Sequence, residues 1–269
     1  EVVDSEGTFH GVPVHGTSSN QGRGDVAMPD WTFYSYGSIH SRAVNSDWLS
    51  DAWVDVQARL RRINHTRHGF IYAGSYRAGP RQGLADAVRS KPPAWLNESL
   101  RAVAPDGFNI SILKTIRSAT EARKEAARKG WVSLYEQCTW PYTFHCGGNH
   151  YSAMLKYKLA CGQTVFFLTG VTKAGHPVQE EFWYDALRDG ENVFFFSKKE
   201  KLWELLRSLL GESPDAPSVA AARGRLAQVG LAGQRLAETY LSQHGLACYV
   251  MLYLKRYYLP LLRQHRAPA

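Results

Sequence analysis

The sequence predicts an α/β fold, a Rossmann-like parallel sheet with helices on both faces. Short runs of β-branched and aromatic residues alternate along the chain with longer stretches of helical periodicity. The chain has 269 residues, 44% of them hydrophobic, which is enough to bury a sheet between two helical layers. Alternating strands and helices imply βαβ units, in which neighbouring strands run parallel.

Hydrophobic periodicity and capping residues predict the helices and strands of the first half of the chain. Residues 1–24 are rich in glycine, histidine and serine and lack periodicity, so they predict a loop. Asp47 caps a helix whose apolar face carries Trp48, Ala52, Trp53, Val56 and Leu60. After it we expect, in order, a strand at Phe70–Ala73, a helix opening at Leu84–Ser90, an irregular connection with three prolines at Lys91–Gly107, and a charged helix at Ser118–Lys129.

The second half holds more buried strands and longer helices. Strands are expected at Tyr142–Phe144, Thr164–Leu168 and Val193–Phe196, where apolar runs are short and bounded by turn residues. Helices are expected at about Ser152–Ala160, Lys199–Leu210, Ala220–Gln243 and Gly245–His265. The alternation therefore predicts one Rossmann-like domain at 66–245, preceded by an incomplete region at 1–65 and followed by a C-terminal helix at 246–269.

The C-terminal helix is apolar but carries Lys255 and Arg256 in its middle, which argues against a membrane span. We expect it to be a buried amphipathic helix that packs part of its apolar face inward. The residues expected there are Tyr249, Leu252, Leu254 and Leu259. The alternative is a partly exposed helix whose apolar stripe faces an N-terminal domain that this chain lacks.

Charge and cysteine content narrow the class of protein. Lys and Arg exceed Asp and Glu by 32 − 24 = 8, which favours an anionic partner: a phosphorylated ligand, nucleic acid or an acidic surface.

The four cysteines form no C-x-x-C pair, and the histidines around Cys146 have the wrong spacing for known structural metal sites. The four cysteines allow at most two disulfides, in three possible pairings, and we expect Cys146 and Cys161 to be buried thiols. Three N-x-S/T sequons, at Asn64, Asn97 and Asn109, favour the secretory pathway weakly.

Two glycine-containing loops follow predicted strands, where open α/β sheets bind their ligands. The loop Gly74–Arg81 has a hydroxyl at Ser75 and guanidinium groups at Arg77 and Arg81. The loop Gly147–Ser152 opens a helix, whose amide groups suit a pyrophosphate, and Lys156 adds a cation one turn later. With the basic balance of the chain, the two loops together predict a nucleotide-phosphate site.

Several well-known site motifs are absent from the sequence. It contains no P-loop, no G-x-G-x-x-G after a strand and no G-x-S-x-G hydrolase elbow. It also contains no D-x-D, which argues against the Mn²⁺ clamp of many sugar-nucleotide transferases. Arginine, lysine and helix dipoles are therefore expected to meet the phosphate charge.

Three segments resemble glycosyltransferase family 90, the capsule-associated and Rumi-like protein O-glucosyltransferase group. Asp25–Tyr34 is similar to its D-x-x-x-P-x-W-T-F-W segment, and Tyr72–Arg81 to its F-R-G-S-R loop with a downstream arginine. Cys138–Leu168 resembles the family core, with S-x-R-L-K-Y-x-L-x-C-G read as Ser152 to Gly162. Weaker similarity continues through Glu180–Phe196 and includes the apolar C-terminal helix with Tyr249–Leu254, so the resemblance covers about 25–262.

The resemblance implies a two-domain GT-B enzyme, of which this chain supplies the C-terminal half. It implies an inverting, metal-independent transfer of glucose or xylose from a UDP-sugar to a protein or glycan hydroxyl, with no cofactor besides the donor. The implied donor-binding residues are Ser75, Arg77, Arg81, Asn149, His150, Ser152 and Lys156. The implied acceptor-side residues are Asp30, Trp31, Phe33 and Tyr34.

Two departures from the family pattern keep a second function open. Met154 stands where the family has arginine, and the family's catalytic aspartate lies upstream of this chain, so the catalytic residue is unknown. The alternative is a catalytically degenerate domain that binds a sugar nucleotide or a glycoprotein. No nucleic-acid module is present, and no nucleic-acid partner is expected. The family and the sequons imply the endoplasmic reticulum or Golgi lumen, or secretion, with room for a membrane tether upstream.

Overall fold

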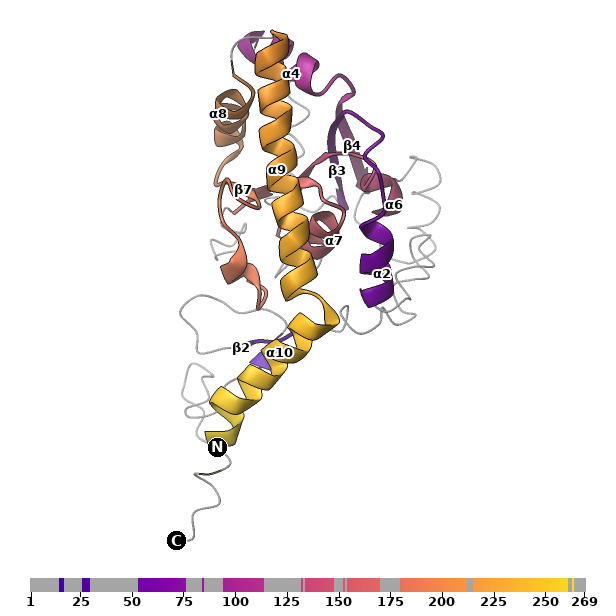
Figure 1. Ribbon diagram of the computed structural model, residues 1–269. Coiled ribbons are helices and arrows are strands. Elements are labelled where there is room, and N and C mark those ends of the chain that lie inside the picture. The colour runs from indigo at the N-terminus through magenta and orange to yellow at the C-terminus, as the bar shows by residue number, and fades with distance from the viewer. Residues whose placement is uncertain are drawn as a thin grey trace.

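A five-stranded, entirely parallel sheet forms the centre of the protein, in the order β4-β3-β5-β6-β7. This computed structural model describes residues 15–16, 26–29, 53–75, 84, 94–113, 132, 134–147, 152, 154–169, 180–211, 215–260 and 263. Figure 1 shows the sheet beside the long helix α9, with further helices around it. The predicted fold class is confirmed.

The described strands and helices alternate along the chain. The predicted helix at Ser118–Lys129, and all but Leu84 of the one opening at Leu84–Ser90, lie outside the described residues. The strands are β1 His15–Gly16, β2 Val26–Ala27, β3 Gly69–Ser75, β4 Gly107–Leu113, β5 Tyr142–Cys146, β6 Thr164–Leu168 and β7 Phe194–Phe196. The helices are α2 Trp53–Leu60, α4 Ala94–Val103, α6 Leu134–Gln137, α7 Leu155–Ala160, α8 Lys199–Leu210, α9 Ala216–Tyr240 and α10 Gln243–Tyr253. A 3₁₀ turn lies at Tyr184–Ala186, and a π-helical turn at Leu254–Tyr258 continues α10. The short β1 and β2 pair with each other in parallel.

A row of phenylalanines crosses one face of the sheet, one from each strand. The ring centroids of neighbouring members lie 5.0 to 5.8 Å apart, within the range of favourable aromatic packing. The row runs from the β4 edge to the β7 edge through Phe108, Phe70, Phe144, Phe166 and Phe194. Because this face is apolar across its whole width, it must be covered, and α4, α8 and the first half of α9 cover it.

The opposite face is covered by α2, α7, the second half of α9 and the start of α10. Val165 and Phe167 of β6 point to this side, because side chains alternate along a strand. Helices therefore lie on both faces, as predicted. The helix α2 belongs to the predicted unit 1–65 but shares its core with α7 and β6. The division at residue 65 stays a prediction.

Helix α9 serves both faces because it passes the end of the sheet where the strands begin. Its Leu226 is buried with the first face and its Leu236 with the second. Between them, the backbone of Gly230 packs so closely on Gly162 and Thr164, at the entry to β6, that an added Cβ would lie 2.5 Å from the Gly162 carbonyl oxygen. The hydroxyl of Thr164 donates a hydrogen bond to the Leu226 carbonyl, 2.6 Å away. The first residues of β6 are thus fixed against the middle of α9.

Two parts of the sequence prediction for this region were wrong or incomplete. The expected irregular connection at Lys91–Gly107 contains helix α4, and the strand β4 that follows it was not predicted. The prolines of this connection stand just before Ala94 and just after Val103, so they bound the helix rather than prevent it. Helix α7 begins at Leu155 instead of Ser152.

Cys161 was predicted to be a buried thiol, and this was wrong because it forms a disulfide with Cys138, with a Cα–Cα distance of 5.5 Å. Cys138 stands four residues before β5, and Cys161 three residues before β6. These strands are parallel neighbours, so the segments that enter them lie side by side. Cys146 is a buried thiol, as predicted, and Cys248 is an exposed one.

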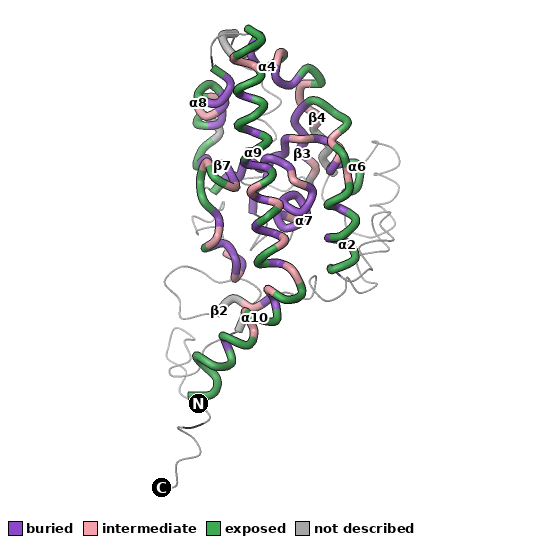
Figure 2. The backbone as a smooth tube through the Cα atoms, viewed as in Figure 1, coloured by how far each residue is buried: buried purple, intermediate pink, exposed green. Residues whose placement is uncertain are grey.

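The C-terminal helix was expected to pack inward, and most of it does not. Leu252 is 65% exposed, Leu254 38% and Leu259 44%. Tyr249 is half-buried against Phe182, with ring centroids 4.5 Å apart. Figures 1 and 2 show α10 leaving the body at an angle to α9, with a largely exposed surface. Few of the residues that the structure describes pack against this helix, so it is partly exposed, as the alternative expected. That its apolar stripe faces another domain stays a prediction.

Candidate functional site

The order of the strands creates a switch point between β3 and β5. From β3 the chain passes through α4 and returns to the sheet as β4, on one side of β3. From β5 it passes through α7 and returns as β6, on the other side. The two connections cover opposite faces of the sheet. In open α/β sheets, a ligand crevice lies at the carboxyl ends of the strands where such connections diverge.

The hydrogen-bond register shows that β3 and β5 separate toward this end. Only Phe70 with Tyr142 and Ile71 with Thr143 are paired between them. By contrast, β3 stays paired with β4 through Ser75, and β5 with β6 through Cys146. The sheet is therefore intact at the amino ends of its strands and divided between β3 and β5 at their carboxyl ends.

Where the ladder between β3 and β5 stops, a buried lysine donates a hydrogen bond to the first strand carbonyl beyond it. Thr164 N donates to the Pro141 carbonyl, so the polar groups of residues 141, 143 and 145 face β6 and those of 142 and 144 face β3. The Phe144 carbonyl lies one step beyond the last β3–β5 pair. It accepts a hydrogen bond from the ammonium group of Lys158 on α7, which is 3% exposed. The side-chain nitrogen of Lys158 thus lies where the two strands part.

Two further buried side chains bridge the strands at the same level. The hydroxyl of Thr143 donates to the Ile71 carbonyl at 3.1 Å. The hydroxyl of Tyr72 and the thiol of Cys146 lie 3.5 Å apart. All of these polar groups are buried. Substituting apolar side chains for them would therefore remove hydrogen bonds that hold the strands at their present separation.

Three of the predicted donor-binding residues lie in the described part of the chain. Ser75 is the last residue of β3. Ser152 is half-buried and precedes α7, and its carbonyl accepts a hydrogen bond from Leu155 N at 3.4 Å. Ser75 therefore forms the carboxyl end of β3, and Ser152 follows the carboxyl end of β5. The predicted residues that lie outside the described residues are Arg77, Arg81, Asn149, His150, Asp30, Trp31, Phe33 and Tyr34.

Lys156, the third of them, lies in the interior. Its exposed fraction is 0%, and its ammonium nitrogen is 5.7 Å from the ring centroid of Trp53 on α2. The ring of Tyr157 lies 5.3 Å from the same nitrogen. An ammonium group this close to aromatic faces is stabilised by their quadrupoles. In this structure Lys156 joins α7 to α2 and does not present its charge to solvent.

Lys158, Thr143 and Tyr72 were not predicted as site residues. All six residues of α7 are buried, and Lys158 is one of two lysines among them. A lysine in a short helix between two buried strands is the sequence signal that could have identified it, because lysine is buried only when its charge has partners. No corresponding signal marks Thr143 or Tyr72, whose roles depend on the interruption of the ladder.

Two features are absent from the part of the chain that the structure describes. No three histidine, cysteine, aspartate or glutamate side chains come close enough there to hold a metal ion. Among the same residues, no helix combines the length and the apolar character needed to cross a membrane.

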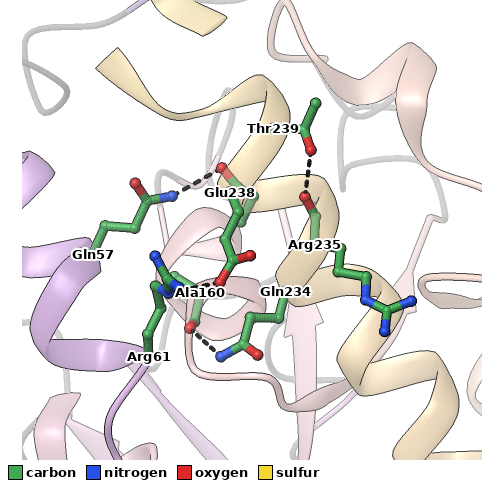
Figure 3. A network of polar contacts seen from close by, with 8 residues as sticks. Gln57, Arg61, Ala160, Gln234, Arg235, Glu238 and Thr239 are labelled. Atoms are coloured by element: carbon green, nitrogen blue, oxygen red, sulfur yellow. Dashed lines mark hydrogen bonds and ion pairs between the residues drawn. The ribbon is translucent and has the colours of Figure 1, made fainter. Parts of the chain in front are cut away.

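A cavity of about 390 Å³ lies at the other end of the sheet, where the strands begin. Tyr142 and Thr164, the first residues of β5 and β6, line it together with His65. Beside it a polar network joins α2, α7 and α9, which Figure 3 shows. In this network Arg61 forms an ion pair with Glu238 at 2.7 Å, and the Gln234 amide donates to the Ala160 carbonyl at 3.1 Å.

The half-buried His65 gives this end of the sheet a pH dependence. Burial lowers the pKa of His65 below its ordinary value of 6.5, and the hydrogen bond with the Cys161 carbonyl partly opposes the lowering. As the pH falls below 6.5, the unfolded chain takes up a proton at His65 before the folded chain does. The free energy of unfolding should therefore fall with the pH until the folded-state pKa is passed.

In His65→Gln, the contribution of His65 to the dependence of unfolding free energy on pH should vanish. Urea unfolding from about pH 7 to about pH 5 measures this dependence. A dependence equal to that of the wild type would contradict the assignment.

A family model described as "Glycosyl transferase family 90" matches residues 3–265, nearly the whole chain. No curated protein sequence matches.

Weak similarities to solved structures were also found. The C-terminal domain of a glycosyl transferase group 1 family protein, LpcC from Francisella tularensis, is 12% identical with a TM-score of 0.37; the alignment covers 79% of this chain and 97% of that domain. Anabaena Alr3699/HepE, solved in complex with UDP-glucose, is 10% identical with a TM-score of 0.42, over 75% of this chain and 52% of that one. This chain thus spans about half the length of HepE.

Proposed function

The chain belongs to glycosyl transferase family 90, and from this premise we propose that it binds a UDP-sugar at the carboxyl ends of β3 and β5. The reaction proposed is inverting transfer of glucose or xylose to a hydroxyl of a protein or glycan acceptor, without a metal ion. In this proposal the chain is the nucleotide-sugar-binding half of a two-domain GT-B enzyme. HepE, a structure weakly similar to this chain, was solved with UDP-glucose.

The observation that carries the proposal is the separation of β3 from β5 at the switch point. Pairing between them stops at Ile71 and Thr143, while each strand continues beside its other neighbour. Both loops that the sequence marks as phosphate-binding begin where these two strands end, after Ser75 and after Cys146. A diphosphate at this place would meet backbone amides and hydroxyls from both loops.

The proposed chemistry places charge stabilisation on the side of the leaving group. The acceptor hydroxyl attacks the anomeric carbon as a base removes its proton, and the bond to the UDP oxygen breaks. Breaking this bond adds one negative charge to the diphosphate, which already carries two, and cations fixed in advance stabilise it. We assign this role to the guanidinium groups of Arg77 and Arg81, with the hydroxyls of Ser75 and Ser152. Lys158 lies beneath the crevice, where its buried side-chain nitrogen donates to the Phe144 carbonyl of β5.

The competing proposal is a domain that binds the sugar nucleotide without turning it over. It is favoured by Met154, which stands at the start of α7 where the family has arginine. The two proposals agree on binding and differ in catalysis. Release of UDP from UDP-glucose or UDP-xylose in the presence of an acceptor protein separates them.

The compartment proposed is the endoplasmic reticulum or Golgi lumen, or the outside of the cell. The disulfide between Cys138 and Cys161 supports it, because disulfides persist in oxidising compartments and are rare in the cytosol. Its two cysteines are 0% and 2% exposed, so the bond belongs to the folded core and is shielded from the solvent.

A titration of UDP tests the binding proposal. Arg81→Ala should weaken UDP binding about tenfold or more, because a charge-assisted hydrogen bond to phosphate contributes about 1.5–3 kcal/mol. The matched control is Arg235→Ala, an exposed arginine of α9 whose backbone carbonyl, and not its side chain, accepts the hydrogen bond from Thr239. Isothermal titration calorimetry of the wild type and both variants gives the affinities.

The two variants give distinct outcomes. Weaker binding in Arg81→Ala with unchanged binding in Arg235→Ala supports the assignment. Equal affinities in all three proteins would remove Arg81 from the site. Equal losses in both variants would mean that UDP responds to the overall positive charge and not to a site at the switch point.

A further inference from the structure

We propose that Asn64 carries an N-linked glycan, and that Asn97 and Asn109 do not. The inference concerns a modification site distant from the proposed donor crevice, and it rests on the proposed function only for the oxidising secretory compartment. Each of the three asparagines stands in an N-x-S/T sequon. The structure places the three sequons in different surroundings.

Asn64 lies in the irregular segment between the end of α2 and the start of β3. Asn64 and Thr66, the first and third residues of its sequon, are both exposed. Residues 63–68 belong to neither helix nor strand, so the segment can present an extended backbone to a transferase. A bulky, hydrophilic glycan attached here would extend into solvent without displacing the core.

The other two sequons lie in regular structure. Asn97 belongs to α4, and Ser99, the third residue of its sequon, is 1% exposed. Asn109 lies in the middle of β4, is half-buried and is paired in register with Ile71, which is 0% exposed. A glycan on Asn109 would have to share the sheet face with Ile71, so it would compete with packing of the strand.

A hollow beside Asn64 suits the first sugars of such a glycan. Asn64 lines the cavity of about 390 Å³ at the amino end of the sheet. Its walls also include Leu231, which is 46% exposed, and the polar side chains of Arg61 and Gln234. An N-acetylglucosamine has an apolar ring face and several hydroxyls, so it could cover Leu231 while its hydroxyls face the polar groups. Figure 3 shows Arg61 and Gln234 within this network, with Ala160 between them in the view.

The position also keeps the glycan away from the proposed donor crevice. The cavity is lined by Tyr142 and Thr164, the first residues of β5 and β6. The crevice lies at the opposite ends of these parallel strands. A glycan on Asn64 should therefore leave UDP binding unchanged.

The experiment is to secrete the full chain from cultured eukaryotic cells and to treat it with peptide-N-glycosidase. The wild type should lose the mass of one glycan, and release in heavy-oxygen water should mark Asn64 as the converted residue. The untreated Asn64→Gln variant should have the mobility of the treated wild type. The matched variants Asn97→Gln and Asn109→Gln should behave as the wild type.

A second pair of variants tests the sequon itself while keeping Asn64. Thr66→Ala should abolish the glycan, and Thr66→Ser should retain it, since serine keeps the hydroxyl that the sequon requires. A secreted wild type without any enzyme-sensitive mass would overturn the inference. So would a glycan that persists in Asn64→Gln.

Titration of UDP into Asn64→Gln distinguishes failure of this inference from failure of the proposed function. If the wild type binds no UDP but carries the glycan, the proposed donor site fails and the modification site stands. If UDP binds with the same affinity to wild type and variant, the separation of the two sites is supported. A tenfold change in affinity would contradict that separation.

Discussion

The variant Cys138→Ala/Cys161→Ala is expected to lose about 3 kcal/mol of unfolding free energy, because it opens a covalent loop in the unfolded chain. The two cysteines are 23 positions apart, and their bond ties the segment before β5 to the segment before β6. The bond therefore restrains the entry of both central strands. Equilibrium unfolding in urea measures the loss.

The exposed thiol of Cys248 provides the matched control for this substitution. Cys248→Ala should change the unfolding free energy by less than about 0.5 kcal/mol. A reducing agent should destabilise the wild type and leave the double variant unaffected. If the double variant were as stable as Cys248→Ala, the covalent link between the two strand entries would make no contribution.

Substituting Gly230 by alanine should have the second large effect. An alanine Cβ there would lie 2.5 Å from the Gly162 carbonyl oxygen and 3.1 Å from Thr164 N. Both are backbone atoms at the entry to β6, and they cannot move without shifting the strand or α9. We expect a loss of at least about 2 kcal/mol, within the range for overpacking a close contact.

Gly224 of the same helix gives the opposite expectation for the same substitution. Nothing lies within 4 Å of a Cβ added there. Gly224→Ala should stabilise the protein by about 0.5–1 kcal/mol, because alanine loses less conformational entropy in a helix. Thermal and urea unfolding of the two variants should thus move in opposite directions. If both stabilise the protein, the close packing of α9 on β6 is not present.

The sequence predicted the central strands because they are continuous apolar runs. Thr164–Leu168 was predicted with its observed bounds, since a strand buried on both faces needs apolar residues at every position. The edge strand β4 escaped prediction because Asn109 and Ser111 interrupt its apolar residues.

The candidate site was predictable as a pair of loops and not as a geometry. Glycines and arginines after the strands identified where β3 and β5 end. The separation of these strands could not be predicted, because it depends on where hydrogen-bond pairing stops in three dimensions. For the same reason Lys158 appeared as one more lysine of a helix, although it donates to a strand carbonyl.

The disulfide could have been predicted from the fold. Once β5 and β6 are taken as adjacent parallel strands, residues at similar distances before each strand become neighbours. Cys138 and Cys161 satisfy this condition. The exposure of α10 was not predictable from periodicity, because an apolar stripe indicates which face seeks a partner but not whether this chain supplies it.

Hydrogen–deuterium exchange with and without UDP tests the central claim most directly, because it locates binding along the chain. The account predicts that UDP slows exchange of backbone amides at the carboxyl ends of β3 and β5, residues 72–75 and 144–147, and in the loops that follow them. Exchange at the amino ends of the strands, at residues 63–68 and 162–164, should not change. Protection at the amino ends, or none at the carboxyl ends, would contradict a donor site at the switch point.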